Sequence, residues 1–381
     1  MSVWPRTQPS RAAALRMIVA PFLTAKIISF LVPVLVVWNN SQALGRPSGD
    51  ELSAAFNAWD SQSYVHLAIH GYPTNVGSDT GYLAAFLPGY PLLVRFGYLL
   101  FGNAVVSGLM ISFVAEAVAL YYIALLVRAE REAAAARFTL WVFALWPFAF
   151  LLSAVYTEST FIACAAASLY HARRGDHFRA CLAAALSCAV RVTGVALIPA
   201  LAWELLARKR LRVSVLDVLA LIAIPAPLIA YGAYMRLHAN DAFAFFTAQS
   251  SPSFNHTFAA PWVGFFATLA NVDDTLPATH TYVFGLEVIF GVLGAVLCIA
   301  LWVRRDYPRS FAIYCTGVLL TATSLSHWLS VPRYELAMFP ALIAISDLTR
   351  RRLQLRAAIV GVSSALMSFG ATLYASGRWL G

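Results

Sequence analysis

Charged residues are scarce in this sequence. They make up 12% of its 381 residues, whereas hydrophobic residues make up 60%, and the mean hydropathy is +0.70. Soluble domains carry about 25% charged residues, so this composition excludes an ordinary soluble protein. The length alone would suit two or three soluble domains, but the composition favours one all-α, polytopic membrane bundle over residues 1–381.

Cysteine is also rare, and its placement argues against a disulfide framework. The five cysteines are Cys164, Cys181, Cys188, Cys298 and Cys315. All lie in apolar runs, and none falls in an expected outer loop. The sequence also lacks CxxC pairs, glycine-rich phosphate loops and repeats with a period of about 20–50 residues.

Acidic residues are outnumbered, with 18 Asp and Glu against 27 Lys and Arg, so the net charge is +9. A nucleic-acid partner would suit this excess, but the basic residues lie in short clusters at the ends of apolar runs. This is the positive-inside pattern of membrane proteins. We therefore expect no nucleic-acid partner and a cytoplasmic N-terminus. Residues 1–17 show no small-residue cleavage site, which favours a retained first helix over a signal peptide.

Long apolar runs predict the spans, since a transmembrane helix needs about 20 apolar residues. Six long runs cover 17–38, 104–127, 214–236, 282–303, 309–328 and 355–375. Five shorter runs cover 137–153, 157–171, 178–190, 194–207 and 336–349. The basic clusters fall on one side if all of these cross the membrane, so we expect about eleven spans.

Two expected outer loops are long, residues 39–103 and 237–281. Such loops are usually functional or disordered, and these are rich in Trp, Phe, Tyr and Pro, which disordered segments avoid. We expect both to carry short amphipathic helices, at Tyr90–Leu100 and Ala242–Gln249. Function should therefore be sought on the extracytoplasmic face.

The stretch "AFNAWDSQSYVHLAIHGY" places Asp60 behind Trp59 at the start of a helix that runs to His70. Gly71 and Pro73 would end that helix. Two roles are open for Asp60: a helix cap, the common use of such an Asp, or a general base whose pKa is raised by apolar surroundings.

Two further outer segments carry candidate residues. "AAFLPGYPLLVRF" has two prolines around Gly-Tyr, which predicts a rigid elbow. In "SAVYTESTF", Glu158 follows Tyr156 in the first turn of the next span. Either the Glu158 carboxylate interacts favourably with the helix dipole, or it binds sugar hydroxyls.

Two arginines suggest that the protein binds an anion. Arg191 in "CAVRVTG" lies within a hydrophobic hairpin, where a charge is costly and indicates function unless it snorkels to the interface. Arg333 in "SHWLSVPRYELAMFP" lies on the outer side beside His327 and Tyr334. An interfacial anchor and a phosphate clamp are both open for Arg333. With Asp60 and Glu158, these residues would suit an amphiphile that carries a phosphate and a sugar.

The second long loop contains "NDAFAFFTAQSSPSFNHTFAAPW", which could cover such a site. Its aromatic side chains suit a lipid or the face of a sugar, and Gln249 would bond a hydroxyl group.

Six motifs, in order, resemble those of the PIG-V-like mannosyltransferases, a branch of the GT-C membrane glycosyltransferases. They read "WDSQSYVHLAIHGY", "AAFLPGYPLL", "SAVYTESTF", "VRVTG", "NDAFAFFTAQ" and "PRYELAMFP". The sequence departs from the family pattern in two places. Phe86-Leu87-Pro88 is followed by Gly89 instead of a bulky residue, and Asn240 stands where a glycine is usual.

The resemblance implies a GT-C-like bundle and inverting transfer of a sugar, with mannose favoured, from a polyprenyl-phosphate carrier to a hydroxyl acceptor. Asp60 would be the catalytic base, and Arg333, with Arg191, would stabilise the departing phosphate. The expected substrate-binding residues are Trp59, Tyr64, Tyr156, Glu158, Arg191, Gln249, His327, Arg333 and Tyr334. No DxD pair accompanies Asp60, so we expect no metal or other cofactor.

A transporter or flippase for a lipid-linked sugar is the competing interpretation, since it would use the same arginines without needing a base. Transporters often show internal repeats and midplane sites, and neither pattern is evident here. The acceptor stays open among a glycolipid, a polysaccharide and a protein. A bacterial plasma membrane is the expected location.

Overall fold

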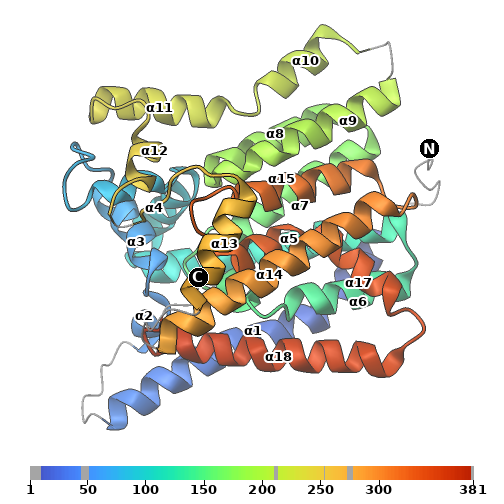
Figure 1. Cartoon of the computed structure of the whole chain (residues 1–381), viewed down its shortest axis with the longest axis horizontal. Coiled ribbons are helices and arrows are strands. Elements are labelled where there is room, and N and C mark those ends of the chain that lie inside the picture. The colour runs from blue at the N-terminus through green and yellow to red at the C-terminus, as the bar shows by residue number, and fades with distance from the viewer. Residues whose placement is uncertain (1–9, 44–50, 210–212, 253, 273–277, 379–381) are drawn as a thin grey trace.

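The computed structural model describes the whole chain except residues 1–9, 44–50, 210–212, 253, 273–277 and 379–381. The described residues form helices and connecting turns, and their one β-type contact is an isolated bridge between Phe258 and Leu325. The expected all-α membrane architecture is confirmed at this level (Figure 1).

The longest α-helices follow the apolar runs of the sequence, and shorter ones lie in the two segments expected as long loops, 39–103 and 237–281. The α-helices are α1 (Arg11–Ala43), α2 (Glu51–Phe56), α3 (Asp60–His70), α4 (Gly89–Phe101), α5 (Ala104–Glu130), α6 (Ala133–Ala144), α7 (Glu158–Arg174), α8 (His177–Val190), α9 (Leu197–Lys209), α10 (Val215–Ile222), α11 (Ala226–His238), α12 (Ala244–Gln249), α13 (Pro261–Val272), α14 (Ala278–Val303), α15 (Arg309–Thr323), α16 (Val331–Ala337), α17 (Leu342–Leu348) and α18 (Leu353–Ala375). Short 3₁₀ segments are η1 (Gly81–Ala85), η2 (Ala149–Ser153), η3 (Val192–Ala196) and η4 (Phe339–Ala341).

Within the described ranges, four helices are long and apolar enough to cross a membrane: α1, α5, α14 and α18. A fifth span results if α10 and α11, which meet at a 46° bend, are counted together. The count of eleven spans therefore stays a prediction.

Several predicted spans are interrupted where proline removes a backbone donor. The run 214–236 is one predicted helix, but it bends between α10 and α11, where Pro225 lies. In the run 137–153, the helix ends at Ala144. Buried turns, which include Pro147 and η2, then lead the chain to α7. The run 336–349 is divided among the end of α16, η4 and α17.

A buried ion pair joins two of the long helices. Lys26 of α1 donates through Nζ to Glu116 Oε2 of α5 at 2.6 Å and to Ser153 Oγ of η2 at 2.7 Å. Both charged side chains are almost completely buried. Because an unpaired charge in such surroundings would be costly, the pair fixes α1 and α5 against the segment that leads into α7.

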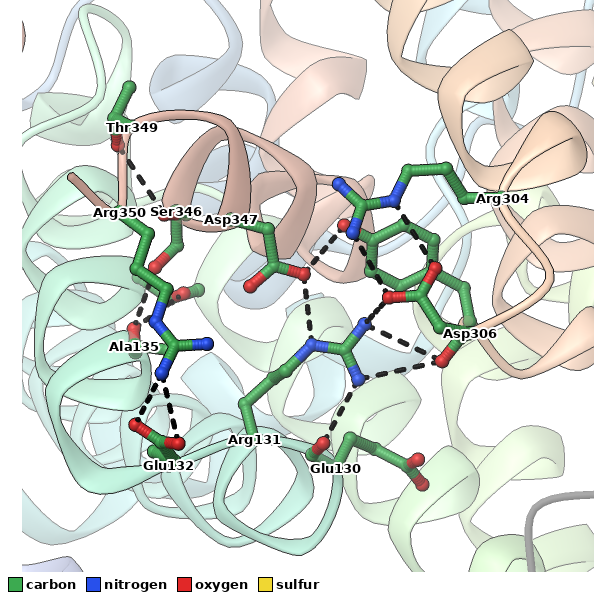
Figure 2. Close-up of polar contacts among 12 residues, drawn as sticks. Glu130, Arg131, Glu132, Ala135, Arg304, Asp306, Ser346, Asp347, Thr349 and Arg350 are labelled. Carbon is green, nitrogen blue, oxygen red and sulfur yellow. Dashed lines mark hydrogen bonds and ion pairs between the residues drawn. The ribbon is translucent and has the colours of Figure 1, made fainter. Parts of the chain in front are cut away.

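The opposite end of the bundle from α3 holds a second set of ion pairs (Figure 2). Arg131, just after α5, donates to Asp347 of α17 at 2.9 Å and to Asp306, between α14 and α15, at 2.8 Å. Arg350 pairs with Glu132 at 3.1 Å, and both of these side chains are exposed. The Arg131 contacts join the α5–α6 connection to α17 and to the α14–α15 connection, whereas the exposed pair contributes little to stability.

Candidate active site

The helix α3 begins at Asp60, ends at His70 and is followed by Gly71 at φ +80°, as the sequence predicts. The helix-cap interpretation of Asp60 is wrong. Trp59 occupies the cap position, and no side chain caps the helix there. Trp59 itself has φ 57° and ψ −128°, a conformation that a bulky residue rarely adopts. Backbone strain of this kind is common beside functional residues.

Tyr374 of α18 holds the turn that leads into α3. Its hydroxyl lies 3.2 Å from the Ala58 carbonyl oxygen and 3.1 Å from Ser61 Oγ. Both contacts flank Asp60 in the chain. The last described helix therefore fixes the backbone around the candidate base.

The Asp60 carboxylate pairs with Arg333 of α16. Arg333 Nη1 donates to Asp60 Oδ2 at 2.8 Å. The same guanidinium donates to Glu158 Oε1 through Nη2 at 2.8 Å and through Nε at 3.0 Å. Arg333 is therefore held between two carboxylates from different parts of the chain, at the starts of α3 and α7, a charge-assisted arrangement that fixes its plane.

Arg191, which follows α8, completes the site from the other side of Glu158. Its Nη1 donates to Glu158 Oε1 at 2.5 Å and to Thr157 Oγ1 at 3.1 Å. We call Asp60, Glu158, Arg191 and Arg333 the charge network. It brings together the four charged residues that the sequence singles out.

Aromatic rings pack on the cations of the charge network. The Arg191 guanidinium lies 4.8 Å from the centre of the Tyr334 ring, and that of Arg333 lies 4.9 Å from the Tyr156 ring. Cation–π contacts of this length are favourable. Tyr156 and Tyr334 therefore support the arginines directly.

The electrostatics keep the arginines charged. Burial alone would lower the pKa of Arg333, but Glu158 and then Asp60 raise it well above its ordinary range. Burial, followed by the Asp60 charge, raises the pKa of Tyr64, so its hydroxyl stays neutral. Asp60 is the accessible carboxylate of the network, with 28% of its side chain exposed against 2% for Glu158.

The predicted elbow lies beside α3. The Tyr64 ring packs against Phe86 and Tyr90, with ring centres 5.1 Å and 5.2 Å apart. Gly89 begins α4, and a Cβ atom there would lie 2.6 Å from the Ala189 carbonyl oxygen. The glycine that departs from the family pattern is therefore required by the close approach of α4 to α8, just before Arg191.

Gln249 and His327 do not contact the charge network in the described structure. They instead flank His256: Gln249 Oε1 lies 3.2 Å from His256 Nδ1, and the two histidine rings are 5.1 Å apart. Burial, followed by the charge of His327, lowers the pKa of His256 to about 4. This second polar cluster joins the loop after α12 to the loop after α15.

Glu287 of α14 supports the start of α16 and is a residue that the sequence reasoning missed. It is fully buried, and its two oxygens accept the backbone N–H groups of Ser330 and Val331 at 2.7 Å each. Ser330 has φ 67° and precedes α16, the helix that carries Arg333. A lone acid in the apolar run "GLEVIFG" was the available signal, because such a residue marks function by default.

Over the residues that the structure describes, no three His, Cys, Asp or Glu side chains gather as a metal site would require. The adjacent acids Asp273 and Asp274 lie outside the described residues. The expectation of no metal therefore stays a prediction.

No protein-family model and no curated protein matches the sequence. Solved structures do match. ArnT from Cupriavidus metallidurans, bound to undecaprenyl phosphate, is 12% identical with a TM-score of 0.55, and the match covers 93% of this chain and 76% of that one. The Archaeoglobus fulgidus oligosaccharyltransferase, in complex with Zn and sulfate, is 14% identical with a TM-score of 0.52.

This chain spans about half the length of the oligosaccharyltransferase, 53%, while 92% of its own residues are matched. At such low identity the likeness concerns the fold alone. The chain shares the helical fold of these proteins, so the GT-C-like fold that the sequence predicts is confirmed as a fold and no further. The PIG-V-like assignment is a finer statement than this likeness supports.

Proposed function

We propose that the protein is an inverting glycosyltransferase that moves a sugar from a polyprenyl-phosphate carrier to a hydroxyl acceptor on the extracytoplasmic face of a membrane. Mannose is the expected sugar, from the sequence resemblance. The single observation that carries the proposal is the charge network, in which an accessible carboxylate pairs with the buried Arg333, and Glu158 links Arg333 to the partly buried Arg191. The fold shared with an undecaprenyl-phosphate-bound protein supports the choice of carrier.

Asp60 is the proposed general base. As the acceptor oxygen bonds to the anomeric carbon, Asp60 takes the acceptor's proton. The bond between the anomeric carbon and the phosphate oxygen breaks, and its electron pair leaves with the phosphate. The arginines offset the charge that develops on that oxygen, which is where positive charge lowers the barrier most.

The ion pair between Asp60 and Arg333 suggests the order of events. With Arg333 Nη1 bonded to Asp60, a donor phosphate must compete for that nitrogen. Once the phosphate takes it, Asp60 is released to accept a proton. Donor binding would thus activate the base, while Glu158 keeps both arginines in place.

The competing function is transport of a lipid-linked sugar. A transporter needs the arginines to hold the phosphate, but it needs no general base within reach of an acceptor hydroxyl. The position of Asp60 therefore favours transfer.

The test is transfer of radiolabelled mannose from polyprenyl-phosphate-mannose, with purified protein in nanodiscs and total membrane lipids as acceptors. Asp60→Asn should abolish transfer while the protein still folds and binds donor. Asp79→Asn, at an exposed Asp of the same outer loop, should transfer normally. Parallel reactions with a chelator test the metal expectation. Equal activity of wild type and Asp60→Asn would refute the assignment of Asp60 as the base. Movement of the donor across liposome membranes, without sugar transfer, would favour the transporter.

A further inference from the structure

A small cavity lies beside the charge network. Glu158, Arg191, Thr193 and Arg333 line its polar side, and apolar residues, among them Phe161, line the rest. Its volume is about 10 Å³, roughly the space that a single water molecule needs. A group of one heavy atom therefore fits, and a whole phosphate does not.

Two of the residues that line this cavity carry a side-chain oxygen that has no partner in the described structure: Glu158 Oε2 and Thr193 Oγ1. Both residues are buried, with exposed fractions of 2% and 1%. An unsatisfied buried acceptor or hydroxyl is costly, and such atoms in native proteins call for an explanation. The other carboxylate oxygen of Glu158 already accepts from both arginines.

The position of Thr193 is fixed by close packing. It belongs to η3, and a Cβ atom on the next residue, Gly194, would lie 2.6 Å from the Cys188 backbone nitrogen. The segment is therefore held tightly against α8, two residues beyond Arg191.

The chemistry of the two unpartnered atoms selects the ligand. A carboxylate oxygen only accepts a hydrogen bond, whereas a threonine hydroxyl donates or accepts. A phosphate oxygen would be repelled by Glu158, but a hydroxyl group can donate to Glu158 Oε2 and accept from Thr193 Oγ1. Building on the proposed function, we propose that this cavity is a specificity subsite that takes one hydroxyl group of the transferred sugar.

The test measures kcat/KM for the sugar that wild type transfers and for the monodeoxy donors that each lack one hydroxyl. Wild type should discriminate against one of these donors by about a hundredfold, since a hydrogen bond to a charged group is lost. Thr193→Val should reduce that discrimination about tenfold, and Thr193→Ser should restore it. Thr160→Val is the matched control, because Thr160 Oγ1 is also buried without a partner but does not line the cavity.

The outcomes separate this subsite from the proposed function. Transfer without discrimination against any monodeoxy donor would overturn the subsite and leave the glycosyltransferase standing. An equal effect of Thr193→Val on all donors would also overturn the subsite, because it would indicate a structural hydroxyl or a fixed water. An effect of Thr193→Val confined to the KM of the acceptor would overturn it as well. Failure of wild type to transfer from any polyprenyl-phosphate sugar would overturn both.

Discussion

Asp60 and Arg333 are 273 positions apart in the chain, yet their side chains meet at 2.8 Å. The contact joins the start of α3 to the first turn of α16. From the local sequence, Asp60 would be expected to cap a helix. In the folded protein its carboxylate binds Arg333 instead.

Arg333→Lys should lower kcat about 100-fold, the usual effect of removing a donor that stabilises developing negative charge. A lysine ammonium is a point charge and cannot bond both carboxylates as the planar guanidinium does. Arg95→Lys is the control, since Arg95 donates to the Ala68 carbonyl oxygen away from the charge network. Wild-type turnover by Arg333→Lys would contradict the role of the guanidinium.

Lys26→Met should destabilise the protein by about 3–5 kcal/mol, because it leaves Glu116 buried without its counter-charge. The double variant Lys26→Met/Glu116→Leu should recover most of this loss, since it removes both charges. Unfolding in detergent measures the two effects. Glu132→Gln, which breaks an exposed pair, should cost about 1 kcal/mol or less. A double variant no more stable than Lys26→Met would show that the pair is not the source of the loss.

Glu287→Gln should lower stability by about 1–3 kcal/mol, because one amide oxygen replaces two acceptors and leaves a buried N–H group unbonded. Hydrogen exchange at Ser330 and Val331 should quicken, and kcat should fall because Arg333 follows on the same helix. Unchanged exchange at these two amides would refute the positioning role even if activity fell.

His256 should make stability depend on pH. Its pKa is lowered from 6.5 to about 4, so between these values the unfolded chain binds more protons than the folded protein. Stability should therefore fall as pH drops from about 6.5 to about 4. His256→Gln should remove this component from a series of unfolding measurements, whereas His70→Gln, on the exposed face of α3, should retain it. An identical pH profile for His256→Gln and wild type would contradict the assignment.

Composition and motif order predict the helical membrane fold, and the placement of Asp60, Glu158, Arg191 and Arg333 on one side of the membrane predicts that they meet. The sequence could not show which carboxylate each arginine binds, because that depends on how α3, α7 and α16 pack. It also could not place Gln249 and His327, which belong to the His256 cluster and not to the charge network. Glu287 stands out as a lone acid in an apolar run, but the sequence could not show its role because its partners are backbone groups.

The charge network has a property that matters while the chain is being made. Asp60 and Glu158 are synthesised long before α16, so their contacts with Arg333 form only when the final part of the chain has been made. Until then Glu158 has Arg191 alone, and Asp60 has no arginine at all. A partly synthesised chain therefore leaves the carboxylates of Asp60 and Glu158 without the Arg333 guanidinium, the group that joins them in the finished protein.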